Sequence, residues 1–434
     1  MSDPRGDDDR RNDKGSVMVV AALAMLALVL FAALAVDVGF MWSSRTQSQN
    51  VNDAAALAAA AVMIKQGGGI APTVEEANAT NEGIQYAASN STVANPSVTV
   101  QSTDFTYGKW DFDTRTLDES VDHSDPYEID AVRVNVRMDG GDNKRSPGLL
   151  SRLFQKSDGS RPHAQGFDVN NTAVAYLGYA GSFEPGAFCL PVAVDSCKLS
   201  SNNGCGDDFC ARSQLPPDPS CTLERAQTDT NGMICGEFSN TADQDMCWTA
   251  LDGSSPSING PDLQKIVDNC SATAVSTEDP IYLDNGDKTS TVDYIRDKFY
   301  GCGKFKTAAG TNEYNTLDDA GNKVPDSWVV LLPVVECQDA THCAGGDTQK
   351  VVGGVCFEVR EVIAPAPGKS CVAPEKSGSA DRLIKGRALC PKSLNPKVVE
   401  LFNKYCLPKD EEPPPRTSDG CNFSIKATRP VLVE

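Results

Sequence analysis

The chain has 434 residues and a formal net charge of −20, from 39 basic and 59 acidic side chains. This length allows two or three domains with sizeable cores. Because nucleic-acid binding requires a basic surface, the acidic balance excludes nucleic acid as an expected partner. It also argues against docking on an anionic lipid surface by charge. Acidic patches that bind calcium or a basic protein are an alternative that composition leaves open.

Residues 1–15 are charged and contain few apolar side chains, so we expect them to form a disordered cytoplasmic tail. Residues 17–36 are twenty consecutive apolar residues with no charge and no proline. A helix needs about 20 such residues to cross a bilayer. A cleaved signal peptide is the alternative, but its apolar region has about 7–15 residues and ends at a small-residue cleavage site. The longer run favours a retained membrane anchor.

The lack of proline and the single glycine, Gly39, predict that residues 16–66 form one helix, about 75 Å long at about 1.5 Å per residue. Three glycines at 67–69 then end it. The part from 43 to 53 is mostly polar, and the part from 54 to 61 is nearly all alanine, which lets another helix approach closely. This surface packs either on a partner helix or on the chain's own ectodomain. The candidates for close packing are Asp37, Gly39, Asp53, Ala54, Ala55, Ala56, Ala58 and Ala59.

Two patterns indicate the orientation of the anchor. Arg5, Arg10, Arg11 and Lys14 precede the apolar run, and the first basic residue after it is Arg45. This bias places the N-terminus in the cytoplasm. All 16 cysteines follow residue 188, and an even number confined to one region indicates disulfides in an oxidising compartment. The predicted location is the inner (cytoplasmic) membrane, with one span and with the bulk of the chain periplasmic or extracellular.

Residues 67–185 contain no cysteine and are predicted to form an α+β domain. The clearest strand is 131–138, where apolar residues such as Val132 and Val134 alternate with polar residues such as Arg133. This period of two buries one face of a strand and exposes the other. The other expected elements are a helix over 73–89, an extended segment over 98–110, a short helix over 149–154 and a strand over 173–179.

Residues 186–434 are predicted to form a disulfide-stabilised region of mixed or mainly β structure. The disulfide candidates are Cys189, Cys197, Cys205, Cys210, Cys221, Cys235, Cys247, Cys270, Cys302, Cys337, Cys343, Cys356, Cys371, Cys390, Cys406 and Cys421. Their pairing cannot be deduced from spacing. The expected elements are strands over 328–335, 355–363 and 423–433 and helices over 261–270 and 291–299.

Proline at position 333 lies inside the first of these strands, which predicts an edge strand or a bulge there. The segments 190–192 and 332–334 both read Leu-Pro-Val. They are either a faint internal duplication or a chance match, and the sequence leaves open whether 186–434 is one domain or two. The predicted fold class is α+β: a long N-terminal transmembrane helix that extends into the periplasm, an α+β middle domain and a disulfide-rich mixed or β C-terminal domain.

The sequence contains no pattern typical of a catalytic or metal site. It has three histidines, no Gly-x-Ser-x-Gly nucleophile turn and no phosphate-binding loop. His342 and Cys343, near Cys337, form the only cysteine–histidine cluster, and no Cys-x-x-Cys pair occurs, which disfavours zinc. The oxygen-rich turns at 284–287 and 317–322 lack the EF-hand spacing. We therefore expect no enzyme, no metal and no cofactor, and leave open whether the ectodomain binds calcium or a surface ligand.

The N-terminal residues resemble those of a known family. Lys14-Gly15-Ser16 precedes the apolar run, Ala35-Val36-Asp37-Val38-Gly39 ends it, and Gln49-Asn50-Val51-Asn52-Asp53-Ala54-Ala55-Ala56-Leu57-Ala58-Ala59-Ala60 follows. These segments are similar to the Tad/Flp pilus-assembly TadE/TadG-like proteins, many of which have an alanine before the aspartate where this chain has Asn52. Tyr107-Gly108-Lys109-Trp110-Asp111, Ala131-Val132-Arg133-Val134 and Ala173-Val174-Ala175 resemble the middle domain of Tad-like proteins more weakly.

The resemblance implies a bacterial envelope protein that helps to build or anchor a type IVc (Flp) pilus used in adherence and biofilm formation. It also implies other pilus-assembly membrane proteins as partners, with pilin as a further candidate. Pseudopilins of this system are cut after a glycine and carry a glutamate five residues later, but the fifth residue after Gly15 is Val20. This favours a TadG-like anchored assembly factor over a processed minor pilin. The sequence also leaves open a surface adhesin with a disulfide-rich binding domain and an anchored enzyme.

Overall fold

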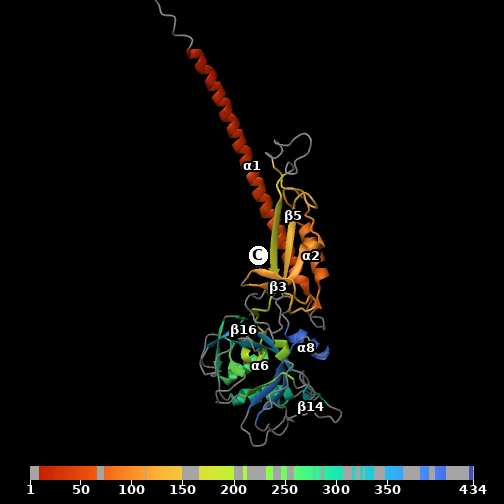
Figure 1. Cartoon of the computed structure of the whole chain (residues 1–434). Helices are drawn as coiled ribbons and strands as arrows, with labels where there is room; N and C mark the ends of the chain where they lie inside the picture. The colour runs from red at the N-terminus through yellow and green to blue at the C-terminus, as the bar shows by residue number, and fades with distance from the viewer. Residues whose placement is uncertain are drawn as a thin grey trace, which may run out of the picture.

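The computed structural model describes residues 9–65, 73–112, 114–148, 166–199, 209–212, 231–237, 246–251, 259–277, 279–284, 288–305, 315–317, 323–325, 328–336, 348–364, 382–390, 396–406 and 430–433. A long N-terminal helix, α1 (Asp9–Met63), leads into a first globular part (Figure 1). A second globular part lies on the side of the first that is remote from the free half of α1 (Figure 1). The helix therefore projects from one end of the molecule.

The helix α1 runs for 55 residues without a break, which confirms a single long helix through the apolar run. It begins at Asp9, so the prediction that all of residues 1–15 are disordered is wrong for the residues from Asp9 onward. It ends at Met63 rather than at residue 66, because the next two residues form β1 (Ile64–Lys65) and pair with β2 (Thr73–Val74). The first half of α1 exposes its side chains, and the second half packs on the first globular part. The same helix is thus exposed over its first half and packed against a protein core over its second half.

The first globular part is a five-stranded antiparallel sheet with helices on one face. The strands, in the spatial order β18-β6-β5-β3-β4, are β18 (Val431–Leu432), β6 (Val169–Tyr176), β5 (Ala131–Met138), β3 (Phe105–Asp111) and β4 (Thr116–Asp118). The second half of α1 and α2 (Glu76–Ala88) share one core with the sheet, to which β5 contributes Val132, Val134 and Val136. The alternation predicted for this strand is therefore confirmed, with apolar residues toward the helices.

The other predicted elements of this part differ from the structure mainly at their ends. The strand over 131–138 has the bounds that the sequence predicts, and the predicted helix over 73–89 is the shorter α2. The segment over 98–110 becomes a strand only at Phe105, because a 3₁₀ turn, η1 (Ser102–Asp104), precedes it. The strand over 173–179 lies earlier, as β6. The predicted helix over 149–154 falls outside the described residues.

Polar contacts fix α2 on the sheet. The Tyr107 hydroxyl shares a hydrogen bond of 2.9 Å with Thr80 Oγ1 and donates to the Glu76 carbonyl at 3.2 Å. Burial raises the pKa of Tyr107 to about 12. His123 Nδ1 lies 2.6 Å from Glu76 Oε1, and this hydrogen bond raises the pKa of His123 above its ordinary value. The first turn of α2 is thus held from both β3 and the segment after β4.

The second globular part contains a seven-stranded sheet in the order β12-β10-β8-β15-β16-β17-β9. Its strands are β8 (Val192–Asp195), β9 (Met233–Glu237), β10 (Met246–Thr249), β12 (Pro280–Asp284), β15 (Trp328–Val335), β16 (Thr348–Ile363) and β17 (Leu383–Ala388). Among these pairings β8 and β15 are parallel and the others are antiparallel. The start of β16 also pairs with β12, so five of the strands close into a ring.

Helices bury both faces of this sheet. On one face α6 (Gly260–Asn269) and α7 (Thr289–Tyr300) pack against alternate residues of β15, among them Val330 and Leu332. On the other face α8 (Pro396–Tyr405) packs against the intervening residues Val329 and Leu331. The short elements are α4 (Ser196–Leu199), α5 (Phe209–Arg212), η3 (Gly303–Phe305), β7 (Ser182–Phe183), β11 (Val275–Ser276), β13 (Asn315–Leu317) and β14 (Lys323–Pro325). Burial on both faces explains why 328–335 is a nearly continuous apolar run.

The predicted strand over 328–335 and the helices over 261–270 and 291–299 are confirmed as β15, α6 and α7, and 355–363 is the second half of β16. Of the two alternatives predicted for Pro333, an edge strand or a bulge, the edge strand is excluded because β15 lies between β8 and β16, and the irregularity is confirmed. Its register with β16 shifts between Val334 and Val335, one residue beyond the proline. This irregularity accommodates a residue that has no N–H to donate.

The chain returns to the first globular part at its end. Val431 pairs with Tyr176, and Leu432 pairs with Ala175, so β18 is the strand next to β6. Only residues 430–433 of the strand predicted over 423–433 are described. The second globular part is therefore inserted between two neighbouring strands of the first.

Disulfides are confined to the second globular part. The ten cysteines among the described residues are all disulfide-bonded, and three bridges have both ends described: Cys189–Cys270, Cys210–Cys390 and Cys356–Cys406. They join residues 81, 180 and 50 positions apart. The other six candidates, Cys205, Cys221, Cys337, Cys343, Cys371 and Cys421, fall outside the described residues. The bridges tie strands and helices of one sheet domain together.

Reduction of the full chain with dithiothreitol should loosen the second globular part and leave the first folded. Each native bridge contributes roughly 2–4 kcal/mol, whereas residues 67–185 contain no cysteine. Limited trypsin digestion should therefore cut 186–434 rapidly after reduction and leave α1 to β6 resistant, with the oxidised chain as control. Equal protection of both parts after reduction would contradict this division.

Candidate functional site

The second half of α1 joins the free helix to the first globular part, and it buries one face. Ser44, Ser48 and Asn52 are each fully buried and lie four residues apart, which places them on one side of the helix. Ala55 and Ala59 are also fully buried and continue the same stripe. The docked face therefore begins with polar side chains and ends with small apolar ones.

Asn52 lies at the centre of this contact. Its Oδ1 accepts a hydrogen bond from the Val136 N–H at 2.9 Å, and its Nδ2 donates to the Asn171 carbonyl at 2.8 Å. Val136 and Asn171 face each other on β5 and β6, so one amide side chain joins both strands to the helix. The Asn171 side chain in turn donates to the Arg45 carbonyl at 2.9 Å. Backbone groups that α1 would otherwise cover without a partner are thereby satisfied.

Three further hydrogen bonds extend this line from Asn52 toward the N-terminus of α1. Ser146 Oγ lies 2.7 Å from Ser44 Oγ and donates to it. Gln49 Nε2 donates to the Thr172 carbonyl at 3.1 Å, and Gln47 Oε1 accepts from a backbone N–H at 2.7 Å. We refer to Ser44, Gln47, Gln49 and Asn52 as the polar seam. It fixes both the rotation of α1 about its axis and its position along the sheet.

Beyond the polar seam, α1 and α2 approach closely over small residues. A Cβ atom at Gly83 of α2 would lie 2.5 Å from the Phe105 ring and 3.0 Å from the Ala55 carbonyl oxygen. Ala55, Ala56 and Ala59 are all fully buried in the core beside it. The alanine block therefore allows α1 to reach the backbone of α2, which longer side chains would prevent.

The predicted packing residues separate into four groups. Ala55, Ala56 and Ala59 lie in the core of the chain's own ectodomain, and Asp53, Ala54 and Ala58 lie half-buried at its rim. Gly39 is exposed, and a Cβ atom added to it would meet no other atom within 4 Å. Asp37 is only 2% exposed and lies on the docked side of the helix.

The sequence predicts that the surface over 43–61 packs on a partner helix or on the chain's own ectodomain, but does not single out Ser44, Ser48 and Asn52 as its contact residues. Their spacing of four in an otherwise charged and amide-rich stretch is the signal that could have identified them.

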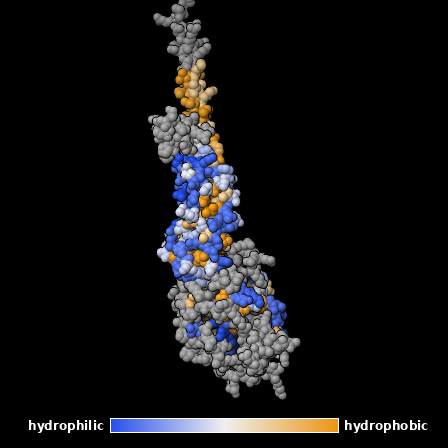
Figure 2. All heavy atoms as spheres, turned by 90° about the vertical axis from the view of Figure 1, so that its right-hand side faces the viewer, coloured by the Kyte–Doolittle hydropathy of each residue, from blue (hydrophilic) through white to orange (hydrophobic). Residues whose placement is uncertain are grey.

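The free half of α1 exposes a band of apolar side chains. Figure 2 shows this band as the hydrophobic segment that projects beyond the hydrophilic surface of the first globular part. Met18, Met25 and Phe31 are about 70% exposed, and Trp42, after the apolar run, is 71% exposed. In the described part of the chain α1 is the single helix long and apolar enough to cross a membrane. A tryptophan at this position is typical of the interface between lipid and water.

Among the described residues, metal-binding side chains form no further candidate site. Within the ranges that the structure describes, no group of three or more His, Cys, Asp or Glu side chains is placed to hold a metal ion. The sequence cluster of Cys337, His342 and Cys343 and the turn residues 285–287 and 318–322 fall outside those ranges.

Two family models match the N-terminal region. One, described as Flp pilus-assembly TadE/G-like, matches residues 15–62, which is nearly the extent of α1. The other, described as Tad-like Flp pilus-assembly, matches residues 43–175, from the start of the docked half of α1 to the end of β6. The N-terminal region of the chain, over residues 15–175, is of the Tad/Flp pilus-assembly, TadE/TadG-like family. No curated protein and no solved structure matches the chain.

The overlap of the two Tad matches has a structural meaning. They share residues 43–62, and these residues carry both the polar seam and the buried alanines. The TadE/G-like region is thus the anchor with its docked half, and the Tad-like region is the same docked half with the sheet and α2 that receive it. The family regions and the apolar helix fit a membrane-anchored Tad assembly protein.

Replacing Asn52 by leucine should weaken the docking of the Tad helix. The substitution leaves the Val136 N–H and the Asn171 carbonyl buried without their partner, which costs about 1–3 kcal/mol in the free energy of unfolding. Gln49→Leu is the matched control, because its contact with Thr172 is solvent-accessible, and it should cost less. Chemical denaturation of the full chain in detergent would measure both. Equal losses in the free energy of unfolding for the two variants would show that burial of the Asn52 hydrogen bonds does not add to the stability of the docked helix.

Ala59→Leu should also destabilise the docked helix, whereas Ala58→Leu should not. Ala59 is fully buried and Ala58 is half-buried, so the larger side chain overpacks the core at 59, at a cost of about 1–3 kcal/mol. At 58 the change should stay within about 0.5 kcal/mol. Thermal unfolding of both variants provides the comparison, and a reversed order would mean that another face of α1 is the docked one.

Proposed function

We propose that this protein is a single-pass, inner-membrane structural and assembly protein of a bacterial Tad (Flp, type IVc) pilus, acting through protein–protein contacts in adherence and biofilm formation. In this proposal the free half of α1 crosses the membrane, and the two globular parts lie in the periplasm or outside the cell. Other pilus-assembly membrane proteins, and pilin, are the proposed partners.

The observation that carries the proposal is the continuity of α1 through the polar seam. The same helix is exposed and apolar over residues 17–36 and is hydrogen-bonded to β5 and β6 over residues 44–52. No turn separates the two halves, so a push or tilt of the membrane segment is passed directly to the sheet. This coupling suits a protein that holds an ectodomain in a set direction beside other membrane proteins.

Two independent features support the proposed orientation. Basic residues precede the apolar run, which favours a cytoplasmic N-terminus. The disulfides lie in the second globular part, at the other end of the molecule from the free half of α1 (Figure 1), and disulfides persist in oxidising compartments. Both features support the same proposed side of the membrane for the ectodomain.

The competing functions differ in what the ectodomain or the N-terminus does. The remote position of the disulfide-rich part (Figure 1) favours a surface adhesin as the second candidate, because that part is the farthest from the anchor. A processed minor pilin is less well supported, since Val20 occupies the position of the glutamate that follows the cut site. The family regions suggest a structural role rather than catalysis.

The test is a pull-down of the C-terminally tagged full chain from gently solubilised membranes, with an untagged strain as control. Mass spectrometry should identify pilus-assembly membrane proteins or pilin, and the N-terminus of the bait should precede Gly15. A mature N-terminus at Ser16 would instead establish the minor pilin. Absence of every such partner would overturn the assembly role, and protease digestion of the second globular part on intact cells would then support the adhesin.

A further inference from the structure

The exposed apolar surface of α1 continues beyond the run of twenty apolar residues. Val38 is exposed, and Trp42 is 71% exposed. Asp37, the first charged residue after the run, lies on the docked side of the helix and is buried, so it does not interrupt this surface. The next charged residue along the helix is Arg45, which is exposed. Apolar side chains are therefore presented over residues 17–42, which make about 39 Å of helix at about 1.5 Å per residue.

This apolar surface is longer than the hydrocarbon core of a bilayer. The core is about 30 Å thick, and each headgroup layer adds about 5–8 Å. The surface therefore extends from the core into at least one headgroup layer. Tryptophan is favoured in that layer, which places Trp42 among the headgroups on the side of the ectodomain.

Two loops of the first globular part lie close to the level of Trp42. In the connection after β5, Ser146 Oγ lies 2.7 Å from Ser44 Oγ, and in the loop after α2 the Val93 N–H donates to Gln47 Oε1 at 2.7 Å. Both contact residues follow Trp42 on α1, by about 3 Å and about 7.5 Å along the axis, and helical side chains lean toward the N-terminus. We refer to the two loops, residues 89–99 and 139–148, as the proximal end, because the free half of α1 leaves the first globular part there (Figure 1).

Hydrogen bonds join the two loops to each other. The Asn143 side chain donates to the Thr99 carbonyl at 2.7 Å and accepts from the Thr99 N–H at 2.8 Å. The Asn95 side chain accepts from the Lys144 N–H at 2.8 Å and donates to the Lys144 carbonyl at 3.1 Å. The proximal end is therefore one connected surface.

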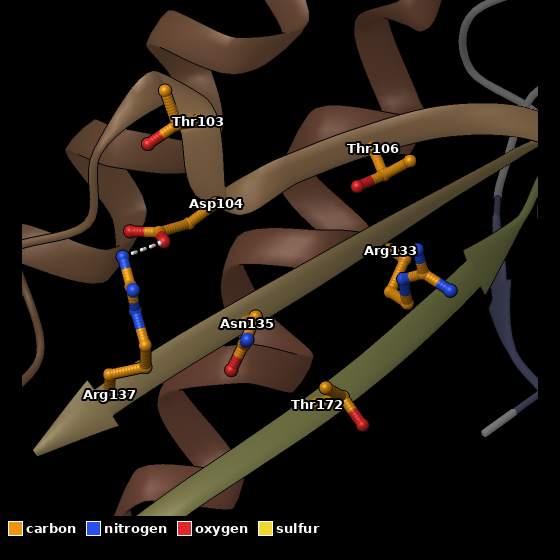
Figure 3. A pocket seen from close by; sticks show the side chains of 7 residues that line it. All are labelled: Thr103, Asp104, Thr106, Arg133, Asn135, Arg137 and Thr172. Atoms are coloured by element: carbon orange, nitrogen blue, oxygen red, sulfur yellow. Dashed lines mark hydrogen bonds and ion pairs between the residues drawn. The ribbon is translucent and has the colours of Figure 1, made fainter. Parts of the chain in front are cut away.

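The proximal end is also fixed on the sheet. Arg137, near the end of β5, binds Asp104 of η1 at 2.6 Å (Figure 3), and η1 leads from the first of the two loops into β3. The polar seam fixes the same sheet on α1. The depth of α1 in a bilayer consequently sets the depth of both loops.

The proximal end presents an apolar side chain and balanced charges. Val93 is 43% exposed in a loop that otherwise begins with the polar residues 90–92. The charged residues at this end are three bases and three acids: Arg45, Lys144, Arg145, Asp139, Asp142 and Asp168. Attraction to an anionic lipid is therefore not what holds this surface to a membrane, whereas transfer of Trp42 and Val93 out of water is favourable.

We propose that the proximal end of the first globular part is seated in the headgroup layer of the membrane that α1 crosses, with Trp42 and Val93 in contact with phospholipid. The bilayer is the occupant because the apolar surface over 17–42 is continuous with the segment that enters the lipid. The inference rests on the proposed function, since it requires that α1 cross a membrane. It adds that the sheet lies directly on the bilayer instead of standing away from it.

The four tryptophans of the chain provide the test. Trp110, Trp248 and Trp328 are buried, and Trp42 is exposed. The full chain is reconstituted into neutral phosphatidylcholine vesicles that carry either a nitroxide on the headgroup or bromine at the middle of the acyl chain, both of which quench tryptophan fluorescence on contact. The headgroup nitroxide should quench the wild-type chain more strongly than the bromine does, and Trp42→Phe should lose this quenching. Sodium chloride should leave it unchanged, because the contact is apolar.

Three further probes are introduced singly into Trp42→Phe, all at exposed positions. Phe31→Trp, in the apolar run, should be quenched mainly by the bromine. Val93→Trp should be quenched by the headgroup nitroxide. Phe112→Trp is the matched control, because Phe112 is 48% exposed but follows β3 at the opposite end of the sheet, separated by the length of β5, roughly 23 Å at roughly 3.3 Å per residue. It should be quenched by neither lipid, and thermal unfolding should show that all variants remain folded.

The probes distinguish failure of this inference from failure of the anchor. Quenching of Phe31→Trp by the bromine without quenching of Val93→Trp by the nitroxide would overturn the proposal and leave the membrane span intact. Absence of quenching at Phe31→Trp would overturn the span itself. Equal quenching of Val93→Trp and Phe112→Trp would show that the nitroxide does not report a seated surface, which also overturns the proposal. Quenching of Val93→Trp that appears only when the vesicles are diluted with excess lipid would show that a second copy of the chain covers the proximal end instead.

Discussion

Asn52 satisfies main-chain groups of two strands from a helix whose other half is long and apolar enough to cross a membrane. A helix pairs its own backbone groups, so it can pass from lipid into a folded domain without a change of conformation. A sheet differs in this respect. A backbone N–H or C=O of a strand that is covered by a helix needs a hydrogen-bond partner from that helix. The amide of Asn52 offers a donor and an acceptor at one point, to Asn171 and Val136. The placement of α1 on the sheet depends on this contact.

Anchor and domain are consequently one folding unit. Ala55, Ala56 and Ala59 contribute to the same core as α2 and the strands, so the first globular part is incomplete without the docked half of α1. The polar seam sets the rotation of the helix, and the small residues set its distance from α2. Asp37, near the end of the apolar run, lies on the docked side and is buried, which keeps its carboxyl group away from lipid-facing positions.

The second globular part is attached differently. It is inserted between β6 and β18 and has its own closed sheet and its own disulfides. Its core and its bridges are thus formed without residues of the docked helix. The family matches stop at residue 175, at the end of β6, which agrees with this division between a Tad region and an inserted domain.

The sequence by itself determined the elements with strong local patterns. The apolar run and the absence of proline predict α1, and the alternation around Val132 and Val134 predicts β5 with its bounds. The Tad resemblance also comes from local segments. Within them, Asn52 stands where many family members have alanine, and local sequence gives this difference no meaning. Only its position opposite Val136 and Asn171, 84 and 119 residues away, reveals what this side chain does.

Tertiary structure alone decided which surfaces meet. The polar stretch over 43–53 has no apolar stripe, so hydrophobic periodicity does not predict which of its residues contact the sheet. Its position is set by hydrogen bonds to strands that are distant in the sequence. Pro333 lies in an interior strand, one residue before the register shift between Val334 and Val335. The strand β18 joins β6 although the whole second part separates them in the chain. These pairings join residues far apart in the chain, and local propensity carries no information about such partners.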